Sequence, residues 1–169
     1  MSTVYWITGL SGAGKTTIGK LFYEKLKEKY PNTVFLDGDT LRRVFGDDLG
    51  YTKEDRRKCA MRYSRLCAML QEQDMNVICC TISMFDSVRE WNRENIHSYK
   101  EIYVKVSMET LHARDQKGLY SGVTEEKQKE VVGVHMEIEE PKCPDLILEN
   151  DGERAPGELA EELIQKCDR

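Results

Sequence analysis

The sequence predicts an α/β fold in which one mainly parallel, five-stranded sheet has helices on both faces. Short runs rich in β-branched and aromatic residues recur along the chain, and longer segments with apolar residues every three or four positions separate them. The short runs are apolar throughout, which is typical of parallel strands covered on both faces. Each parallel connection needs about a dozen residues or more, and the longer segments supply them. We therefore expect strands and helices to alternate along the chain.

Five runs are expected as strands, in chain order: residues 4–8, 33–36, 77–82, 102–106 and 146–148. Helical periodicity is clearest over residues 16–29 and 53–73. Thr52, with Asp55 three residues later, forms a weak capping-box pattern that predicts a helix start near Lys53. Ligands of such sheets bind at the carboxyl ends of the strands, so we expect functional residues directly after each strand.

Length and composition favour one cytoplasmic domain. A chain of 169 residues, 40% of them hydrophobic, can bury one sizeable core, so we expect a single domain over residues 1–169. Thirty acidic and twenty-five basic residues give a net charge of −5, which disfavours binding to nucleic acid. The six cysteines lack CxxC spacing, which indicates reduced thiols rather than a zinc site or disulfides. No apolar run reaches the roughly 18 residues that a membrane helix needs, so no membrane partner is expected.

A glycine-rich loop follows the first expected strand. Residues 9–16 read "GLSGAGKT" and match G-x-x-x-x-G-K-[ST] between a strand and a helix. Glycines let backbone N–H groups turn toward phosphate oxygens, and the helix that follows adds the positive end of its dipole. Lys15 is expected to reach the β- and γ-phosphates, and Thr16 to bind Mg²⁺. The motif predicts a nucleoside triphosphate site; a glycine-rich turn without a ligand is the alternative.

The other strand ends indicate a small-molecule kinase. The run "NVICCTIS" ends without the acidic residue typical of motor ATPases, and no [NT]-K-x-D stretch for reading guanine follows. The second strand instead leads into "LDGDTLR", where Asp37 and Asp39 bring carboxylates to a strand's carboxyl end. Phosphoryl transfer needs a carboxylate that orients the acceptor hydroxyl or accepts its proton, and Asp39 is the candidate. A purely structural Asp-Gly-Asp turn is the alternative.

A basic run, "DRRKCAMR", covers residues 55–62. Arg56 and Arg57 fall near the start of the second expected helix, where cations oppose the helix dipole by roughly 0.3–1 kcal/mol. A nearby anionic ligand would explain them; a solvated helix face is the alternative. Arg56 shares a helical face with Cys59, whereas Arg57 and Lys58 are expected to be solvated.

Two further cationic segments follow strands. Arg42 lies just behind the acidic turn and adds a bidentate donor for phosphate or sulfate. The stretch "RDQKGLY", residues 114–120, follows the fourth strand and combines cations with glycine. Such a segment predicts a mobile lid, over about residues 112–135, that closes on phosphates and excludes water. An ordinary surface loop is the alternative.

Six stretches, in order over nearly the whole chain, resemble the adenylylsulfate kinase family: "GLSGAGKTT", "LDGDTLR", "DLGYTKEDRR", "ISMF", "RDQKGLY" and "GVHMEIEEPKCPDL". This family phosphorylates the ribose 3′-hydroxyl of adenosine 5′-phosphosulfate to give 3′-phosphoadenosine 5′-phosphosulfate in sulfate assimilation. The resemblance implies a P-loop kinase fold, ATP with Mg²⁺ as donor, a mobile lid and often a homodimer.

The resemblance also implies roles for individual residues. It implies that Asp39 serves the 3′-hydroxyl, and that Lys15 and Lys117 are the other catalytic residues. The residues implied on the ATP side are Gly9, Ser11, Gly12, Ala13, Gly14, Lys15, Thr16, Thr17 and Arg114. Those implied around the acceptor are Asp37, Arg42, Tyr51, Arg56, Cys59, Ile82, Ser83, Lys117 and Leu119. Within that set, Arg42 and Arg56 hold the 5′ anionic group.

Four positions depart from the family's usual residues, all on the acceptor side. Cys59 stands where the family has Asn, and Met84 where it has Pro. Val131 stands where a Phe stacks on the acceptor adenine, and Ile138 where another aromatic residue occurs. Loss of a stacking partner typically costs about 1–3 kcal/mol per base. We expect adenylylsulfate as acceptor; the alternatives are a related nucleotide such as cytidine diphosphoramidate, used in capsule synthesis, and a catalytically inactive nucleotide-binding module.

Overall fold

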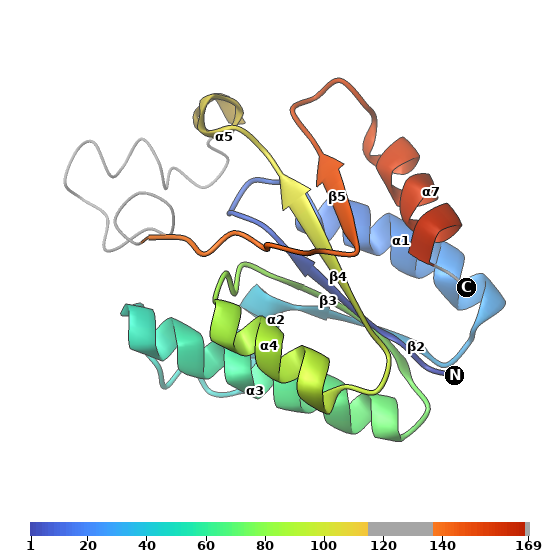
Figure 1. Ribbon diagram of the computed structural model, residues 1–169, viewed down its shortest axis with the longest axis vertical. Helices are drawn as coiled ribbons and strands as arrows, with labels where there is room; N and C mark the ends of the chain where they lie inside the picture. The colour runs from blue at the N-terminus through green and yellow to red at the C-terminus, as the bar shows by residue number, and fades with distance from the viewer. Residues whose placement is uncertain (115–136, 168–169) are drawn as a thin grey trace.

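A five-stranded sheet forms the centre of the molecule (Figure 1). The computed structural model describes residues 1–114 and 137–167. The strands run in the spatial order β2-β3-β1-β4-β5, and every neighbouring pair is parallel. Their bounds are β1 Val4–Thr8, β2 Thr33–Asp37, β3 Asn76–Thr81, β4 Tyr99–Lys105 and β5 Leu146–Glu149. The predicted α/β fold with a parallel five-stranded sheet is therefore confirmed.

Helices cover both faces of this sheet (Figure 1). The described helices are α1 Lys15–Lys29, α2 Gly38–Val44, α3 Lys53–Glu72, α4 Asp86–Asn95, α5 Met108–Arg114 and α7 Pro156–Cys167. Helices α1 and α7 pack together on one face, and α3 and α4 pack together on the other. In the described part of the chain, no helix has both the length and the apolar character needed to cross a membrane.

Alternate residues of each strand face opposite helix layers, because successive side chains of a strand point to opposite sides of a sheet. On β1, Trp6 is fully buried in the core beneath α3 and α4, where it lies with Tyr63 and Val88. Its neighbour Ile7 is fully buried in the other core, with Phe22 of α1. The apolar character of every β1 residue thus follows from its position at the centre of a sheet buried on both sides.

The strand and helix bounds follow the prediction closely, with one correction. Strand β1 has the predicted bounds, and β4 begins three residues earlier than the predicted start at residue 102. No helix was predicted at the Asp-Gly-Asp stretch, for which a structural turn was the alternative, whereas it begins helix α2. The reason is local: the side chain of Asp37 accepts a hydrogen bond of 3.0 Å from the backbone N–H of Asp39, which caps the new helix.

Helix α3 begins as its capping pattern predicts. Thr52 Oγ1 accepts a hydrogen bond of 3.2 Å from the backbone N–H of Asp55, and Lys53 is the first helical residue. The Asp55 carboxylate, in turn, accepts from the backbone N–H of Gly50 at 3.1 Å. These two contacts fix the direction in which the chain enters α3, and with it the positions of the side chains on the first two turns.

Candidate active site

The phosphate loop joins the carboxyl end of β1 to the first turn of α1. It borders a cavity of about 610 Å³, which we call the phosphate cavity. The cavity is lined by Ser11, Gly12, Gly14, Lys15, Thr16, Thr17, Lys20, Phe35, Asp37, Gly38, Asp39, Thr40, Cys80, Thr81 and Ile82. Six of the residues predicted on the ATP side therefore lie in one place. Gly9 and Ala13, also in the loop, do not line the cavity: a Cβ on Gly9 would be 2.6 Å from the carbonyl oxygen of Val104, and Ala13 is buried.

Lys15 and Thr16 begin α1 and face the phosphate cavity. The Lys15 ammonium group is buried and donates a hydrogen bond of 2.8 Å to the carbonyl oxygen of Leu10, so it lies across the loop. Thr16 Oγ1 donates a hydrogen bond of 2.7 Å to Asp37 Oδ2. A hydroxyl and a carboxylate are the hard oxygen ligands that Mg²⁺ prefers. The residues present at this point thus fit a magnesium ion beside the phosphates.

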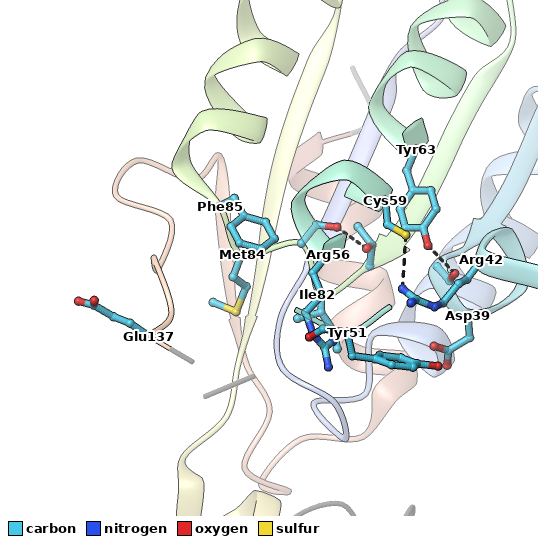
Figure 2. Close-up of a pocket in the computed structure, with 13 residues that line it drawn as sticks. Asp39, Arg42, Tyr51, Arg56, Cys59, Tyr63, Ile82, Met84, Phe85 and Glu137 are labelled. Carbon is cyan, nitrogen blue, oxygen red and sulfur yellow. Dashed lines mark hydrogen bonds between the residues drawn. The ribbon is translucent and has the colours of Figure 1, made fainter. Parts of the chain in front are cut away.

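A second cavity, which we call the acceptor cavity, is bordered by residues of α2, of α3 and of the end of β3 (Figure 2). It has a volume of about 100 Å³. Its lining consists of Gly38, Asp39, Arg42, Tyr51, Arg56, Cys59, Tyr63, Thr81, Ile82, Ser83, Met84, Phe85 and Glu137. Small-ligand sites commonly have about 300 Å³ or more, so the described residues enclose only a small part of such a site.

The two cavities share a wall. Gly38, Asp39, Thr81 and Ile82 border both of them. Asp39 is exposed on the first turn of α2, at the boundary between the two cavities. Asp37 was predicted around the acceptor, but it lines only the phosphate cavity, where it bonds Thr16.

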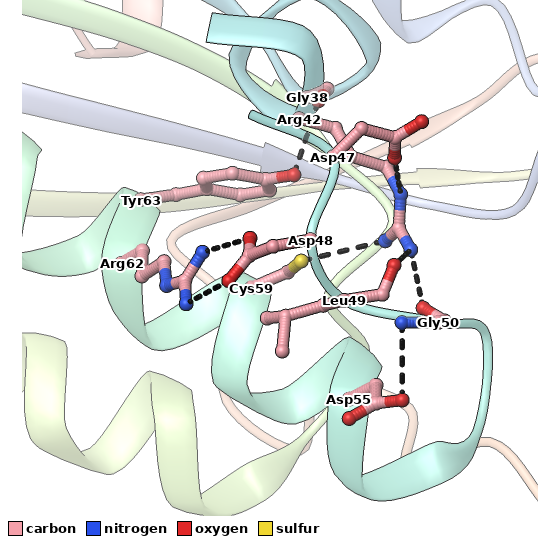
Figure 3. A network of polar contacts seen from close by, with 10 residues as sticks. All are labelled: Gly38, Arg42, Asp47, Asp48, Leu49, Gly50, Asp55, Cys59, Arg62 and Tyr63. Carbon is pink, nitrogen blue, oxygen red and sulfur yellow. Dashed lines mark hydrogen bonds and ion pairs between the residues drawn. The ribbon is translucent and has the colours of Figure 1, made fainter. Parts of the chain in front are cut away.

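Arg42 is tied to the loop that joins α2 to α3 (Figure 3). Its Nε donates to Asp47 Oδ1 at 3.1 Å, and its Nη2 donates to the carbonyl oxygens of Leu49 and Gly50. The Arg42 guanidinium also lies 4.2 Å from the centre of the Tyr51 ring. Arg42 therefore shapes this loop and presents Tyr51 to the acceptor cavity.

Arg56 also lies near the Tyr51 ring, with its guanidinium 5.3 Å from the ring centre. Its Nε donates a hydrogen bond of 2.9 Å to the carbonyl oxygen of Tyr51. Figure 2 shows the ring near Arg42 and Asp39, with Met84 and Glu137 on the opposite side of the cavity. Two cations and one aromatic ring thus border the same space, as anion and base recognition would require.

Cys59 borders the acceptor cavity, but its thiol has a protein partner. Its Sγ accepts a hydrogen bond of 3.3 Å from Arg42 Nη1, and the residue is only 7% exposed. Tyr63, one turn further along α3, donates to the carbonyl oxygen of Gly38 at 3.1 Å. Burial, together with the adjoining Cys59, raises the pKa of Tyr63, so its hydroxyl stays protonated and can make this bond. The predicted common face of Arg56 and Cys59 is confirmed, since both line this cavity.

The end of β3 forms the remaining wall. Thr8 Oγ1 donates to the carbonyl oxygen of Ile82, and the hydroxyls of Thr81 and Ser83 lie 2.6 Å apart. Ser83 has a φ of 31°, in the left-handed region. Met84 is buried and packs with Leu10 and other apolar residues behind the wall.

Arg114, at the end of α5, reaches the phosphate loop. Its Nη1 donates to the carbonyl oxygen of Gly12 at 3.2 Å, and its Nη2 donates to that of Asn150. Most of the predicted lid, with Lys117 and Leu119, lies outside the described residues, as does Val131.

Sequence reasoning missed several residues of the site. Tyr63, Phe85 and Glu137 line the acceptor cavity, and Asn150 contacts the phosphate loop. Asn150 carries a signal that could have found it, because it directly follows β5 and so lies at the carboxyl end of a strand. Tyr63 has no such signal, since its helical spacing is equally typical of a core residue.

Comparisons with known proteins agree with this geometry. Residues 1–149 match the sequence model of the family described as adenylylsulphate kinase. The chain is 41% identical over 163 residues to a cytidine diphosphoramidate kinase of Campylobacter jejuni, which covers 96% of this chain and 95% of that protein. It is 38% identical over 160 residues to an adenylyl-sulfate kinase of Halothermothrix orenii, and this match covers 95% of this chain and 86% of that protein.

A solved structure extends the agreement to three dimensions. The adenylylsulfate (APS) kinase CysC of Mycobacterium tuberculosis, in complex with AMPPNP and APS, superposes with a TM-score of 0.91 at 30% identity, over 99% of this chain and 98% of that one. The P-loop kinase fold is therefore confirmed, and the protein is a phosphotransferase that acts on an alcohol group. The chain belongs to the adenylylsulphate kinase family.

Proposed function

We propose that the protein transfers the γ-phosphoryl group of ATP to the ribose 3′-hydroxyl of a nucleotide that carries a 5′ mixed anhydride. The observation that carries this proposal is the wall shared by the phosphate cavity and the acceptor cavity, with the exposed Asp39 on it. A triphosphate in the first cavity and a nucleotide in the second would meet at this carboxylate. In-line transfer requires that meeting of donor and acceptor.

The chemistry follows from the groups at the shared wall. The 3′ oxygen forms a bond to the γ-phosphorus while the bond from that phosphorus to the β–γ bridging oxygen breaks, and ADP leaves. Asp39 accepts the proton of the 3′-hydroxyl. Lys15 balances the charge that develops on the transferred group. A magnesium ion held at Thr16 would neutralise phosphate charge.

The acceptor is held by its charge and by its base. Arg56 and Arg42 supply the positive potential for the 5′ mixed anhydride, and Tyr51 supplies an aromatic face for the base. Arg42 already donates to two carbonyl oxygens and to Asp47. Arg42 therefore also holds the loop that carries Tyr51, and both arginines supply positive charge to the acceptor cavity.

Adenylylsulfate is the first candidate acceptor. The M. tuberculosis kinase that superposes on nearly the whole chain binds APS together with an ATP analogue. Cytidine diphosphoramidate is the second candidate, and specific observations favour it. The C. jejuni kinase for that nucleotide matches 95% of its own length at 41% identity. In addition, Cys59 and Met84, which line the acceptor cavity here, depart from the residues usual in adenylylsulfate kinases.

A direct assay tests the proposal. The purified protein is incubated with ATP and Mg²⁺, and with adenylylsulfate, with cytidine diphosphoramidate, or without an acceptor. We expect ADP to form only when an acceptor is present, and phosphorus NMR and mass spectrometry to locate the new phosphate on the 3′ oxygen. If the protein binds ATP but neither acceptor makes it form ADP, the proposal is contradicted. The protein would then be an inactive nucleotide-binding module.

A further inference from the structure

Asn150 connects the last strand to the phosphate loop. It directly follows β5 and is 7% exposed. Its Nδ2 donates a hydrogen bond of 2.8 Å to the carbonyl oxygen of Ala13. Its backbone N–H donates to the carbonyl oxygen of Lys105, at the end of β4, at 3.0 Å. The side chain is thus a buried donor, fixed by its own backbone hydrogen bond, that contacts the peptide after Ala13.

That peptide joins Ala13 to Gly14. In a trans peptide the C=O and N–H bonds point in opposite directions, and the described residues contain no cis peptide bond. A contact that holds the Ala13 carbonyl oxygen therefore also fixes the direction of the Gly14 N–H. This N–H belongs to the phosphate loop, whose backbone N–H groups bind phosphate oxygens in loops of this sequence.

The contact is close on the Gly14 side as well. Gly14 has a φ of +97°, and a Cβ at this residue would lie 2.5 Å from Asn150 Nδ2. A side chain at Gly14 would therefore strain the backbone and also displace the amide of Asn150. The backbone carbonyl of Asn150 meanwhile accepts from Arg114, which also bonds Gly12. One residue thus contacts the loop directly and also through Arg114.

We infer that Asn150 is a positioning residue for the donor triphosphate. Its amide holds the peptide between Ala13 and Gly14 so that the Gly14 N–H points at the phosphates. The inference rests on the proposed function in one respect, namely that the donor is ATP. It assigns a function to the end of β5, on the opposite side of the phosphate loop from α2 and the acceptor cavity.

The test compares two substitutions of nearly equal size at two buried asparagines. Asn150→Asp replaces the donor Nδ2 by an oxygen that faces the Ala13 carbonyl oxygen. The matched control is Asn76→Asp at the start of β3, where the residue is 6% exposed and its Oδ1 accepts from the backbone N–H of Thr3. The control keeps its acceptor and is remote from the loop. Binding of AMPPNP with Mg²⁺, a non-hydrolysable ATP analogue, is measured by calorimetry, and the thermal midpoint of each variant is recorded.

We expect the dissociation constant for AMPPNP to rise roughly tenfold or more in Asn150→Asp, because a buried hydrogen bond is replaced by two facing acceptors. The KM for the nucleotide acceptor should stay within about twofold, and Asn76→Asp should bind AMPPNP like the unmodified protein. Equal AMPPNP affinity in folded Asn150→Asp and in the unmodified protein would overturn the inference. So would equal losses for AMPPNP and acceptor, or an equal AMPPNP loss in Asn76→Asp, since those would show general destabilisation.

A milder variant keeps the test decisive if Asn150→Asp does not fold. In Asn150→Ser the side chain keeps a donor, the hydroxyl, but is too short to reach the Ala13 carbonyl oxygen. This variant should fold and should bind AMPPNP more weakly than the unmodified protein. Failure of the proposed function gives a different result, because the unmodified protein would then form no ADP in response to an acceptor, and failure of its ATP site would appear as a loss of AMPPNP binding in the unmodified protein itself.

Discussion

Thr16 and Asp37 link the phosphate loop to the end of β2 through a hydrogen bond of 2.7 Å between Thr16 Oγ1 and Asp37 Oδ2. The other carboxylate oxygen, Asp37 Oδ1, accepts from the backbone N–H of Asp39. One carboxylate therefore sets the spacing between the residue expected to bind the metal and the residue expected to receive the proton.

Asp37→Asn should raise the Mg²⁺ concentration needed for half-maximal activity. The amide is a neutral ligand, so the site loses one negative charge next to the metal. Activity is measured while Mg²⁺ is titrated, and removal of Mg²⁺ with a chelator should abolish turnover in every variant. Asp48→Asn, at an exposed residue paired with Arg62, is the control. An unchanged Mg²⁺ requirement in Asp37→Asn would mean that this carboxylate serves only to cap α2 and to bond Thr16.

Asp39→Asn should lower turnover about 10²–10⁴-fold while ATP affinity changes little. The substitution preserves the shape of the side chain but removes the group that accepts the proton of the acceptor hydroxyl. Steady-state turnover and AMPPNP binding are compared in the same preparation. If ATP affinity collapsed while turnover changed little, Asp39 would be a metal ligand or a structural residue.

Arg56→Ala should weaken acceptor binding far more than ATP binding, by roughly 2–5 kcal/mol, as expected when one partner of a desolvated charge pair is removed. The matched control is its neighbour Arg57→Ala, because Arg57 is half-exposed and pairs with Glu54 on the outer face of α3. The KM for ATP and the KM for the nucleotide acceptor are measured for both variants. Equal effects of the two substitutions would reduce the basic run to a solvated helix face.

Cys59→Asn should change the ratio of the KM values for adenylylsulfate and cytidine diphosphoramidate. The thiol is a weak acceptor for Arg42, whereas an amide both donates and accepts strong hydrogen bonds at the edge of the same cavity. Cys59→Ala separates the two effects, since it removes the contact with Arg42 and adds no new donor. A ratio that stays the same in both variants would make Cys59 a packed helix residue without influence on acceptor choice.

The protein should become less stable in acid, because Glu162 loses its stabilising contacts when it is protonated. Hydrogen bonds from Lys166, and next from Arg154, lower the pKa of Glu162 below the ordinary value of 4.5. A carboxylate with a lowered folded pKa contributes stability above the ordinary value and loses it as the pH falls through the folded value. Glu162→Gln should therefore have a lower thermal midpoint than the unmodified protein at pH 7, by an amount equivalent to about 1 kcal/mol or less. The difference should shrink as the pH is lowered from about 4.5 toward 3; a constant difference would contradict this assignment.

The fold was predictable because its strands are short, apolar and separated by periodic helices. The cap of α3 was predictable because Thr52 and Asp55 carry the relevant side chains. Helix α2 was not, since an aspartate before glycine is equally typical of a turn and of a helix N-cap. A helix forms here because the Asp37 side chain accepts from the backbone N–H of Asp39. This contact depends on the folded structure and cannot be read from the residue types.

The contacts of Arg42 show a second limit of sequence reasoning. Its charge and its place after β2 predicted a ligand-binding arginine. Two of its partners are backbone carbonyls, of Leu49 and Gly50, and every residue carries such a group. Their directions depend on the path of the loop, where Asp47 has a φ of 50°. Gly46 and Asp47 are residue types that favour a positive φ, but they do not say which carbonyl oxygens the turn will aim at Arg42.

The wall shared by the two cavities has a consequence for how kinases of this kind diversify. Cys59, Tyr51 and Met84 border the acceptor cavity and do not border the phosphate cavity. Substitution at Cys59 and Tyr51 can therefore explore new acceptors while the residues that line the phosphate cavity stay unchanged, whereas Met84 also packs against Leu10 of the phosphate loop. The protein offers a natural starting point for directed evolution of nucleotide 3′-kinases, in which a change of substrate need not begin with a loss of catalysis.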